Sequence, residues 1–270
     1  MSVRPLPAPE VRESNGRVGG RRGPDGRAAG GEPARLTLLD GFALDCGPRS
    51  VHVSKTLQRL LAFVALRGRA TRALVAGTLW PDSDESKAFG RLRTALWRLH
   101  RLGVPLLAAH GETLRLHPSV RVDVDELLAE DGSGRHPRGG ALRELLPGWY
   151  DDWVLVERER LRQICLHTWE ESAVRELRAG RFAEALEAVL VALRAEPLRE
   201  SPHRLLLEIH LAEGNYSEAV YTYHAYRMLL HRELGVGPSP RMRRLLDAAV
   251  EPASGAGGPS PGERGEGPAR

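Results

Sequence analysis

The chain has 270 residues, of which 41% are hydrophobic and 27% are charged, the balance of an ordinary globular protein with one or two domains. No apolar run approaches the ~18 residues that span a bilayer, and residues 1–35 lack the apolar stretch of a signal peptide, so we expect a cytoplasmic protein without membrane contact. Two distant cysteines, Cys46 and Cys165, exclude both a disulfide framework and a cysteine zinc site.

Charge is distributed unevenly along the chain. Residues 36–122 contain 13 Lys and Arg against 6 Asp and Glu, whereas residues 123–250 contain 17 against 22. A basic module joined to an acidic one indicates that only the first meets a polyanion. Residues 1–34 and 251–270 are rich in Gly, Arg and Pro without hydrophobic periodicity, and we predict that both are disordered tails.

Residues 35–122 predict short strands, three helices and a terminal hairpin. The strands are expected at 36–40, 41–46 and 51–53, and the first helix at 55–67 behind Ser54 as N-cap. Thr71 caps a second helix that ends at Trp80, and Asp82, Ser83 or Asp84 caps a third that runs to about Leu102. Two strands at 106–108 and 113–116 form the hairpin. This order is that of an α+β winged helix-turn-helix domain.

The third helix carries two opposed faces. At 100° per residue, its apolar side chains form one stripe: Phe89, Leu92, Leu96 and Leu99. Its polar and basic side chains form the other: Lys87, Arg91, Thr94, Arg98 and Arg101, with Arg93 also a candidate contact. No acidic residue stands at i+4 to neutralise the basic stripe, as a merely solvated helix would require. We therefore expect this face to lie in the major groove of double-stranded DNA.

Further DNA contacts are predicted in two places. His110 and Arg115 lie in or beside the hairpin, where a wing touches the neighbouring groove or backbone. Ser54, Lys55 and Thr56 open the first helix, whose free N–H groups favour a phosphate. Simpler roles stay open, with Ser54 as a cap and His110 as a turn residue. Trp80 and Trp97 are expected to pack between helices rather than to stack on bases.

An internal repeat predicts the fold of residues 123–250. Four pairs of like residues are each 34 positions apart: Gly180 and Gly214, Phe182 and Tyr216, Glu184 and Glu218, Ala185 and Ala219. This is the tetratricopeptide period, and it predicts an all-α domain with helices at 163–179, 183–195, 203–213 and 217–234. Additional helices are expected near 123–130, 141–147 and 240–249. Tyr221, Tyr223 and Tyr226 either line the concave face or belong to the core.

Several motifs resemble those of the SARP-type antibiotic-pathway regulators and their bacterial transcriptional activator domain. They include Leu79-Trp-Pro-Asp, Arg91-Leu-Arg-Thr-Ala-Leu-Trp-Arg-Leu, Leu145-Leu-Pro-Gly-Trp-Tyr-Asp-Asp-Trp-Val and Glu196-Pro-Leu-Arg-Glu. The resemblance covers about residues 35–250. It implies an OmpR-type winged helix that reads direct-repeat promoter sites with its third helix, often as two molecules in tandem, and assists RNA polymerase as an activator. Gly90 is an unfavourable residue for the interior of that helix. No receiver or nucleotide-binding domain is evident in the sequence.

Other functional classes have weaker support. The chain has no phosphate-binding G-x-x-x-x-G-K-[ST], no G-x-S-x-G elbow and no paired metal ligands, so neither catalysis nor a cofactor is expected. The acidic residues Asp151, Asp152, Glu157 and Glu159 fit a solvated turn or a helix N-terminus. The remaining alternative is a tetratricopeptide-type interaction or signalling scaffold without DNA readout. RNA binding lacks the usual aromatic platforms.

Overall fold

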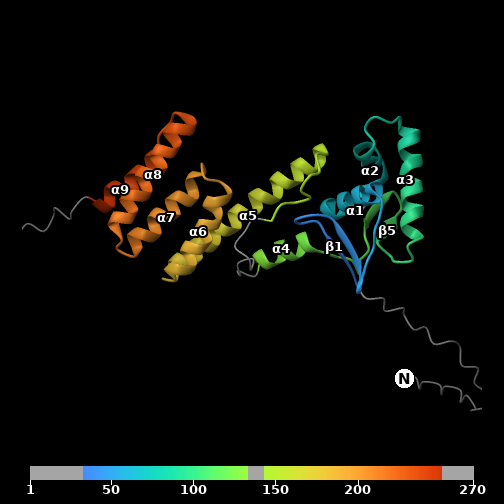
Figure 1. Cartoon of the computed structure of the whole chain (residues 1–270), viewed down its shortest axis with the longest axis horizontal. Coiled ribbons are helices and arrows are strands. Elements are labelled where there is room, and N and C mark those ends of the chain that lie inside the picture. The colour runs from blue at the N-terminus through green and yellow to red at the C-terminus, as the bar shows by residue number, and fades with distance from the viewer. Residues whose placement is uncertain (1–32, 133–142, 251–270) are drawn as a thin grey trace, which may run out of the picture. The chain divides into compact units, whose positions relative to one another are not determined.

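The computed structural model describes residues 33–132 and 143–250 (Figure 1). The predicted tails, 1–34 and 251–270, therefore lie outside the described residues except for positions 33 and 34. The described chain is mainly helical, with two small sheets near its N-terminal end and only helices after residue 151. The predicted fold class is confirmed. No described helix is both long and apolar enough to cross a membrane.

The first sheet has the strand order β3-β2-β1-β7. It consists of β1 (Ala34–Thr37), β2 (Ala43–Cys46), β3 (Arg49–Ser50) and β7 (Arg121–Val122). Strand β1 is antiparallel to β2 and parallel to β7. The strand predicted at 51–53 is wrong, because the chain pairs two residues earlier, at Arg49–Ser50 against Asp45–Cys46. The side chains of Val51 and Val53 instead pack against the core as partly buried residues.

Three helices and a second sheet complete the winged helix-turn-helix. The helices are α1 (Lys55–Arg67), α2 (Arg72–Leu79) and α3 (Glu85–His100), and the sheet has the order β4-β6-β5, with β4 (Arg69–Thr71), β5 (Leu107–His110) and β6 (Thr113–Leu116). The Thr71 hydroxyl accepts from Leu74 N at 3.2 Å, and Asp84 accepts from Lys87 N at 2.8 Å. These two caps and the β5–β6 hairpin are confirmed, whereas α3 ends two residues before the predicted Leu102.

Helix α3 packs on the core through a mixture of large and small side chains. Leu92 and Leu99 are buried as predicted, together with Ala88 and Ala95, while Phe89 and Leu96 lie at the edge of the core as partly buried residues. The two alanines let α3 lie close to α1 and α2, which it contacts. Compared with the predicted apolar stripe, the buried face of α3 is therefore rotated about the helix axis toward the alanines and away from Phe89.

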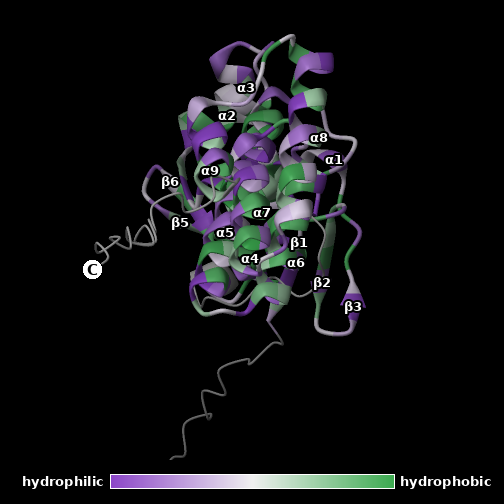
Figure 2. Cartoon of the chain, turned by 90° about the vertical axis from the view of Figure 1, so that its left-hand side faces the viewer, coloured by the Kyte–Doolittle hydropathy of each residue, from purple (hydrophilic) through white to green (hydrophobic). Residues whose placement is uncertain are grey.

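Six helices follow the winged helix. They are α4 (Asp123–Gly132), α5 (Asp152–Arg178), α6 (Phe182–Ala195), α7 (Glu200–Ala212), α8 (Tyr216–Leu234) and α9 (Pro240–Val250). The predicted repeat helices are confirmed, although α5 begins eleven residues earlier than expected. Figure 2 shows hydrophobic and hydrophilic residues alternating around these helices, as amphipathic packing requires. Within the repeat, Tyr223 and Tyr226 are buried and Tyr221 is exposed.

The helix predicted at 141–147 is wrong for its described residues, 143–147. Leu145 forms a β-bridge with Leu39, and Leu146 N donates to Leu38 O at 2.8 Å. Both leucines are buried in the same core as β1. Pairing with the distant segment that follows β1 therefore overrides the local helical pattern. Residues 141 and 142 lie outside the described part of the chain.

Helix α5 contributes to two hydrophobic cores. Its first half, through Cys165, belongs to the core that contains β1 and α1–α3, and its second half, from Leu166, belongs to the core of α6 and α7. Phe63 of α1 meets Trp153 edge-on at 5.2 Å between ring centroids. The domain boundary after residue 122 stays a prediction. Cys46 and Cys165 form no disulfide among the described residues.

Candidate nucleic-acid interface

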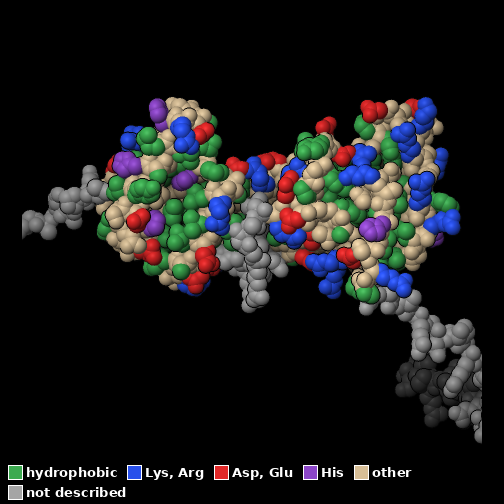
Figure 3. Space-filling model, viewed as in Figure 1, with side chains coloured by type: hydrophobic (Ala, Val, Ile, Leu, Met, Phe, Trp, Pro, Cys, Tyr) green, Lys and Arg blue, Asp and Glu red, His purple; other side chains and the backbone are tan. Residues whose placement is uncertain are grey.

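The exposed side of α3 borders a hollow of about 580 Å³. Helix α3 supplies most of its lining, and α1 and the residue after α2 supply the rest: Lys87, Gly90, Arg91, Thr94, Ala95 and Arg98, with Thr56, Leu57 and Trp80. Figure 3 shows Lys and Arg side chains gathered along the edge that α3 forms in Figure 1. The structure thus brings together four of the predicted α3 contacts and Thr56.

The cations of this hollow differ in their partners. Arg91 and Arg98 are exposed and form no salt bridge with any described residue. Lys87, in contrast, pairs with Asp84 at 2.7 Å, so the prediction that the whole stripe is unneutralised is wrong at this residue. The hydrogen bonds from the Lys87 side chain and backbone hold the pKa of Asp84 below its usual value. The N-cap of α3 therefore doubles as an ion-pair partner.

Thr94 and Gly90 shape the middle of the same face. The Thr94 hydroxyl donates to Gly90 O at 3.0 Å, which leaves its oxygen lone pairs directed outward as acceptors. A Cβ on Gly90 would meet nothing closer than the Arg93 side chain at 4.0 Å. The glycine is thus not required by packing within the protein, and its cost in helix propensity has no structural compensation in the described residues.

Arg93 and Arg101 lie on α3 or at its end but do not line the hollow. The Arg101 guanidinium lies 5.0 Å above the ring of Trp97, a cation–π contact. Trp97 is 57% exposed, so the prediction that it packs between helices is wrong. Its spacing of four residues from both Arg93 and Arg101 places it on the basic side of the helix, a signal that the sequence already held.

The wing forms a second hollow, lined by β4, β5 and β6. Arg115 donates to His110 Nε2 at 2.9 Å, and both residues line the hollow with Arg69, Thr71 and Thr113. The predicted residues His110 and Arg115 are therefore in contact. Arg69, which was not predicted from the sequence, lines the same hollow. Arg69 was missed because it belongs to β4, a strand too short for the pattern to predict.

The start of α1 places its three predicted contacts differently. Ser54 and Thr56 are exposed, and the Ser54 side chain forms no cap hydrogen bond. The Lys55 ammonium lies 3.3 Å above the ring of Trp149. Burial lowers the pKa of Lys55, and Arg59 lowers it further, while Asp151 opposes the shift. Lys55 thus contacts the chain around Trp149, whereas Thr56 faces the hollow beside α3.

The acidic residues before and within α5 have structural partners. Asp151 accepts from Arg59 at 2.5 Å, which joins α1 to the start of α5. Glu157 is buried and pairs with Arg160 at 2.7 Å and Arg67 at 3.5 Å. The sequence-based interpretation as a solvated turn is therefore wrong for Asp151 and Glu157. The second alternative, a helix N-terminus, holds for Asp151, the N-cap of α5.

Comparison with known proteins covers both parts of the chain. The family model of the bacterial transcriptional activator domain matches residues 137–249. The regulatory protein AfsR of Streptomyces griseus is 29% identical over 256 residues, and AfsR of Streptomyces coelicolor is 30% identical over 213 residues. These alignments cover 84% and 71% of this chain but only 26% and 22% of the two relatives. The regulatory protein DnrI of Streptomyces peucetius is 26% identical, with 76% of this chain and 90% of DnrI covered.

A solved structure has the same fold. EmbR of Mycobacterium tuberculosis, determined in complex with a low-affinity phosphopeptide, matches with a TM-score of 0.64 at 18% sequence identity. The match covers 81% of this chain and 65% of that one. At this identity the likeness establishes the arrangement of the helices and strands alone.

The fold and the basic face of α3 define a winged-helix transcription regulator with a C-terminal helical repeat domain. The family model, the three relatives and the shared fold agree with this class. The chain is similar to the SARP-type transcriptional regulators, and its residues 137–249 match the bacterial transcriptional activator domain.

Proposed function

We propose that the protein binds double-stranded DNA in a sequence-specific manner through α3 and activates transcription from the promoters it binds. One observation carries the proposal: Arg91 and Arg98 are exposed on one face of α3, beside Thr94, without a salt bridge among the described residues. An unpaired guanidinium is ready to bind phosphate or the O6 and N7 atoms of guanine. A helix of 16 residues is about 24 Å long, enough to follow the major groove.

The wing and α1 are proposed to hold the protein in register. His110, Arg115 and Arg69 would contact the backbone or the adjacent minor groove, and Ser54 and Thr56 would present the first N–H groups of α1 to a phosphate. Helix α1 suits this role because its first turn contains no acidic residue. Helix α3 does not, because Asp84 and Glu85 make its N-terminus acidic. The middle of α3, rather than its first turn, therefore meets the DNA.

The further steps of the proposal concern assembly. Two molecules would bind direct repeats in tandem and contact RNA polymerase, with no catalytic step of their own, in the cytoplasm where the chromosome is read. These roles are proposed from the resemblance of the chain to SARP-type regulators. They are separable from DNA binding, because each can be measured on DNA already bound.

Titration of DNA against the full chain at several salt concentrations tests the proposal. Fluorescence anisotropy would follow a labelled random duplex of 30 base pairs and a duplex enriched by selection from a random pool. Release of counterions from about four phosphate contacts predicts that log K falls with log salt at a slope of about −3 to −4. The enriched duplex should bind at least about 1,000-fold more tightly than the random one.

Arg93→Ala provides a matched control, because it removes one arginine from α3 outside the hollow. We expect it to change the affinity for the enriched duplex less than Arg91→Ala does. A flat salt response, or enrichment that yields no preferred sequence, would contradict DNA readout and favour the scaffold alternative.

A further inference from the structure

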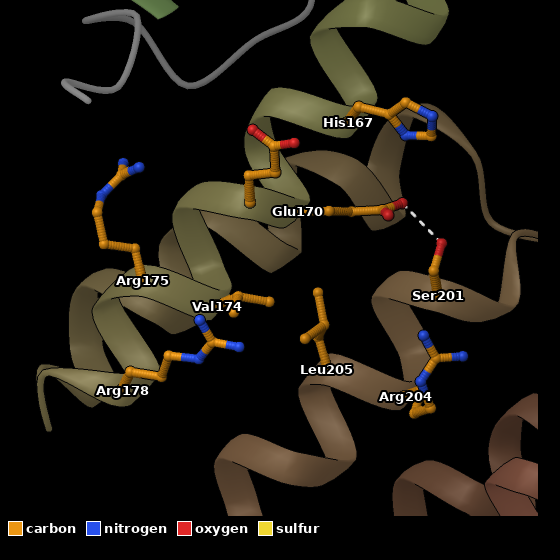
Figure 4. Close-up of a pocket in the computed structure, with 9 residues that line it drawn as sticks. His167, Glu170, Val174, Arg175, Arg178, Ser201, Arg204 and Leu205 are labelled. Atoms are coloured by element: carbon orange, nitrogen blue, oxygen red, sulfur yellow. Dashed lines mark hydrogen bonds between the residues drawn. The ribbon is translucent and has the colours of Figure 1, made fainter. Parts of the chain in front are cut away.

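The helical domain contains a groove of about 610 Å³ between α5 and α7, the first helices of successive helix pairs. Helix α5 supplies most of the lining and α7 the rest: His167, Glu170, Glu171, Val174, Arg175 and Arg178, with Ser201, Arg204 and Leu205. None of these residues belongs to the proposed DNA interface. Figure 4 shows Val174 and Leu205 directed toward one another across the groove. Its floor is thus apolar and its rim is charged.

Two arginines dominate one end of the groove. Arg178 is exposed, has no hydrogen bond or salt bridge with a described residue, and extends past Val174 toward Leu205 (Figure 4). Arg204 is on the opposite helix, and among the described residues its one salt bridge is a long contact of 3.8 Å with Glu208. Arg175 points away from the groove and donates to Ser172 at 2.7 Å. The cations available to a ligand are therefore Arg178 and Arg204.

The carboxylates of the groove do not neutralise these two arginines. Glu170 accepts from Arg199 at 2.6 Å and from Ser201 at 2.7 Å, and its side chain is 15% exposed. Glu171 is exposed but precedes Arg178 by seven residues, roughly 10 Å along the helix axis. One carboxylate is thus held by its own arginine, and the other is too far along α5 to pair with Arg178.

The charge of the domain around the groove and the apolar floor of the groove determine which kind of anion the groove can bind. Residues 123–250 carry five more acidic than basic residues, so a long polyanion such as DNA would be repelled by the rest of the domain. A short segment with few carboxylates would not. The groove also has an apolar floor between the arginines. Burial of a ligand side chain on Val174 and Leu205 supplies much of the affinity, and a free inorganic anion has no such side chain.

We propose that this groove binds a short acidic peptide segment of a partner protein. Asp or Glu carboxylates of the segment pair with Arg178 on one helix and Arg204 on the other, and an apolar side chain between them lies on Val174 and Leu205. The helical domain thereby holds a protein partner at a surface separate from α3. The proposal goes beyond DNA binding and does not depend on it.

Anisotropy with labelled nonapeptides tests the groove on the full chain. The probes are a peptide of alternating Glu and Leu, its Gln–Leu counterpart and its Glu–Ser counterpart. We expect saturable binding of the Glu–Leu peptide alone, and a loss of about 10-fold or more for either counterpart, since each removes one half of the recognition. Arg178→Gln and Arg204→Gln should each lower the affinity for the Glu–Leu peptide by about 10-fold.

Arg227→Gln is the control variant, because Arg227 is exposed on α8 and does not line the groove; it should bind like wild type. Circular dichroism would verify that each variant keeps its helical content, and the peptide exchanges test the groove without changing the protein. Absence of binding, equal binding of the Gln–Leu peptide, or full competition by inorganic phosphate would overturn the proposal. Arg91→Ala should leave peptide binding unchanged, so a failure of DNA readout is distinguishable from a failure here.

Discussion

Helices α3 and α5 are both rich in arginine, but their arginines have different partners. On α5, Arg160 pairs with Glu157 at 2.7 Å, and Arg158 donates to the backbone oxygens of Leu145 and Leu146 at 2.9 and 2.8 Å. On α3, Arg91 and Arg98 have no salt bridge among the described residues. Arginine content alone therefore does not single out the proposed DNA-reading helix. On α3 two unpaired arginines line one hollow, whereas on α5 the arginine without a salt bridge among the described residues is Arg178, at the end of the helix.

The sequence explains this difference. Helix α5 alternates its charges in Glu157-Arg158-Glu159-Arg160, so a carboxylate lies within one turn of each arginine of this segment. After Glu85, helix α3 has no acidic residue up to its end. Lys87 of α3 does form an ion pair, because Asp84 lies three residues before it, within one helical turn. Pairing within a helix thus depends on local spacing, which a sequence displays directly.

The largest expected effect is the loss of DNA affinity when the unpaired arginines are removed. Arg91→Ala combined with Arg98→Ala should weaken binding to the enriched duplex by about 100-fold, because each contact contributes about 1–3 kcal/mol. Anisotropy titration measures the loss, and circular dichroism should show unchanged helical content. Arg160→Ala combined with Arg162→Ala removes the same charge from α5 and should change the affinity by less than about 3-fold. Equal losses in the two double variants would abolish the distinction between the helices.

A smaller effect is expected when the partner of the paired arginines is altered. Glu157→Gln keeps the shape of a buried side chain but removes the charge that binds Arg160 and Arg67. The free energy of unfolding should fall by about 1–2 kcal/mol, since a buried charge-assisted contact is lost. Urea unfolding measures it. An unchanged unfolding midpoint would show that the α5 ion pairs do not stabilise the fold. At urea concentrations too low to unfold the protein, the DNA affinity should stay at the wild-type value.

The smallest effect concerns Lys87, the paired cation on the proposed DNA-reading helix. Asp84→Asn keeps an N-cap acceptor but removes the carboxylate beside Lys87, so DNA affinity should rise about 3-fold as one more cation meets the phosphates.

The wild-type carboxylate also has a lowered pKa. Its contribution to stability is therefore present above the pKa of the unfolded chain and is lost as pH falls through the folded value. In urea unfolding, the variant should lack this component of acid sensitivity as the pH falls from 5 through the usual range of a carboxyl group and below it. A weaker DNA affinity would contradict the expected role of Lys87.

Elements with their own end signals could be predicted from the sequence. Thr71 and Asp84 cap α2 and α3 where expected, and the 34-residue repeat located α6 to α8 because small residues and aromatics recur at the sites where paired helices meet. Elements that depend on distant partners could not. Leu145 and Leu146 look helical alone but pair with Leu39 and Leu38, which follow β1, and Arg49–Ser50 form a strand only because β2 lies beside them.

The candidate site divides in the same way. The stripe of α3 follows from helical spacing, and the structure places Lys87, Arg91, Thr94 and Arg98 around one hollow. The contribution of Thr56 to that hollow and the contact of Lys55 with Trp149 depend on how α1 packs. Spacing within one helix cannot supply either contact. The exposure of Trp97, in contrast, follows from its helical spacing to Arg93 and Arg101 and could have been predicted.

The continuous helix α5 has a consequence for exchanging modules among regulators of this kind. Because its first half closes the core of the winged helix, a fragment that stops at Val122 would leave Phe63 without Trp153 and would expose Leu38 and Leu39, which now lie beside Leu145 and Leu146. A chimaera that carries a new DNA reader onto this repeat should therefore be joined inside α5, after Cys165. A helix has no flexible joint there, so the insertion of one residue would rotate everything downstream by about 100°.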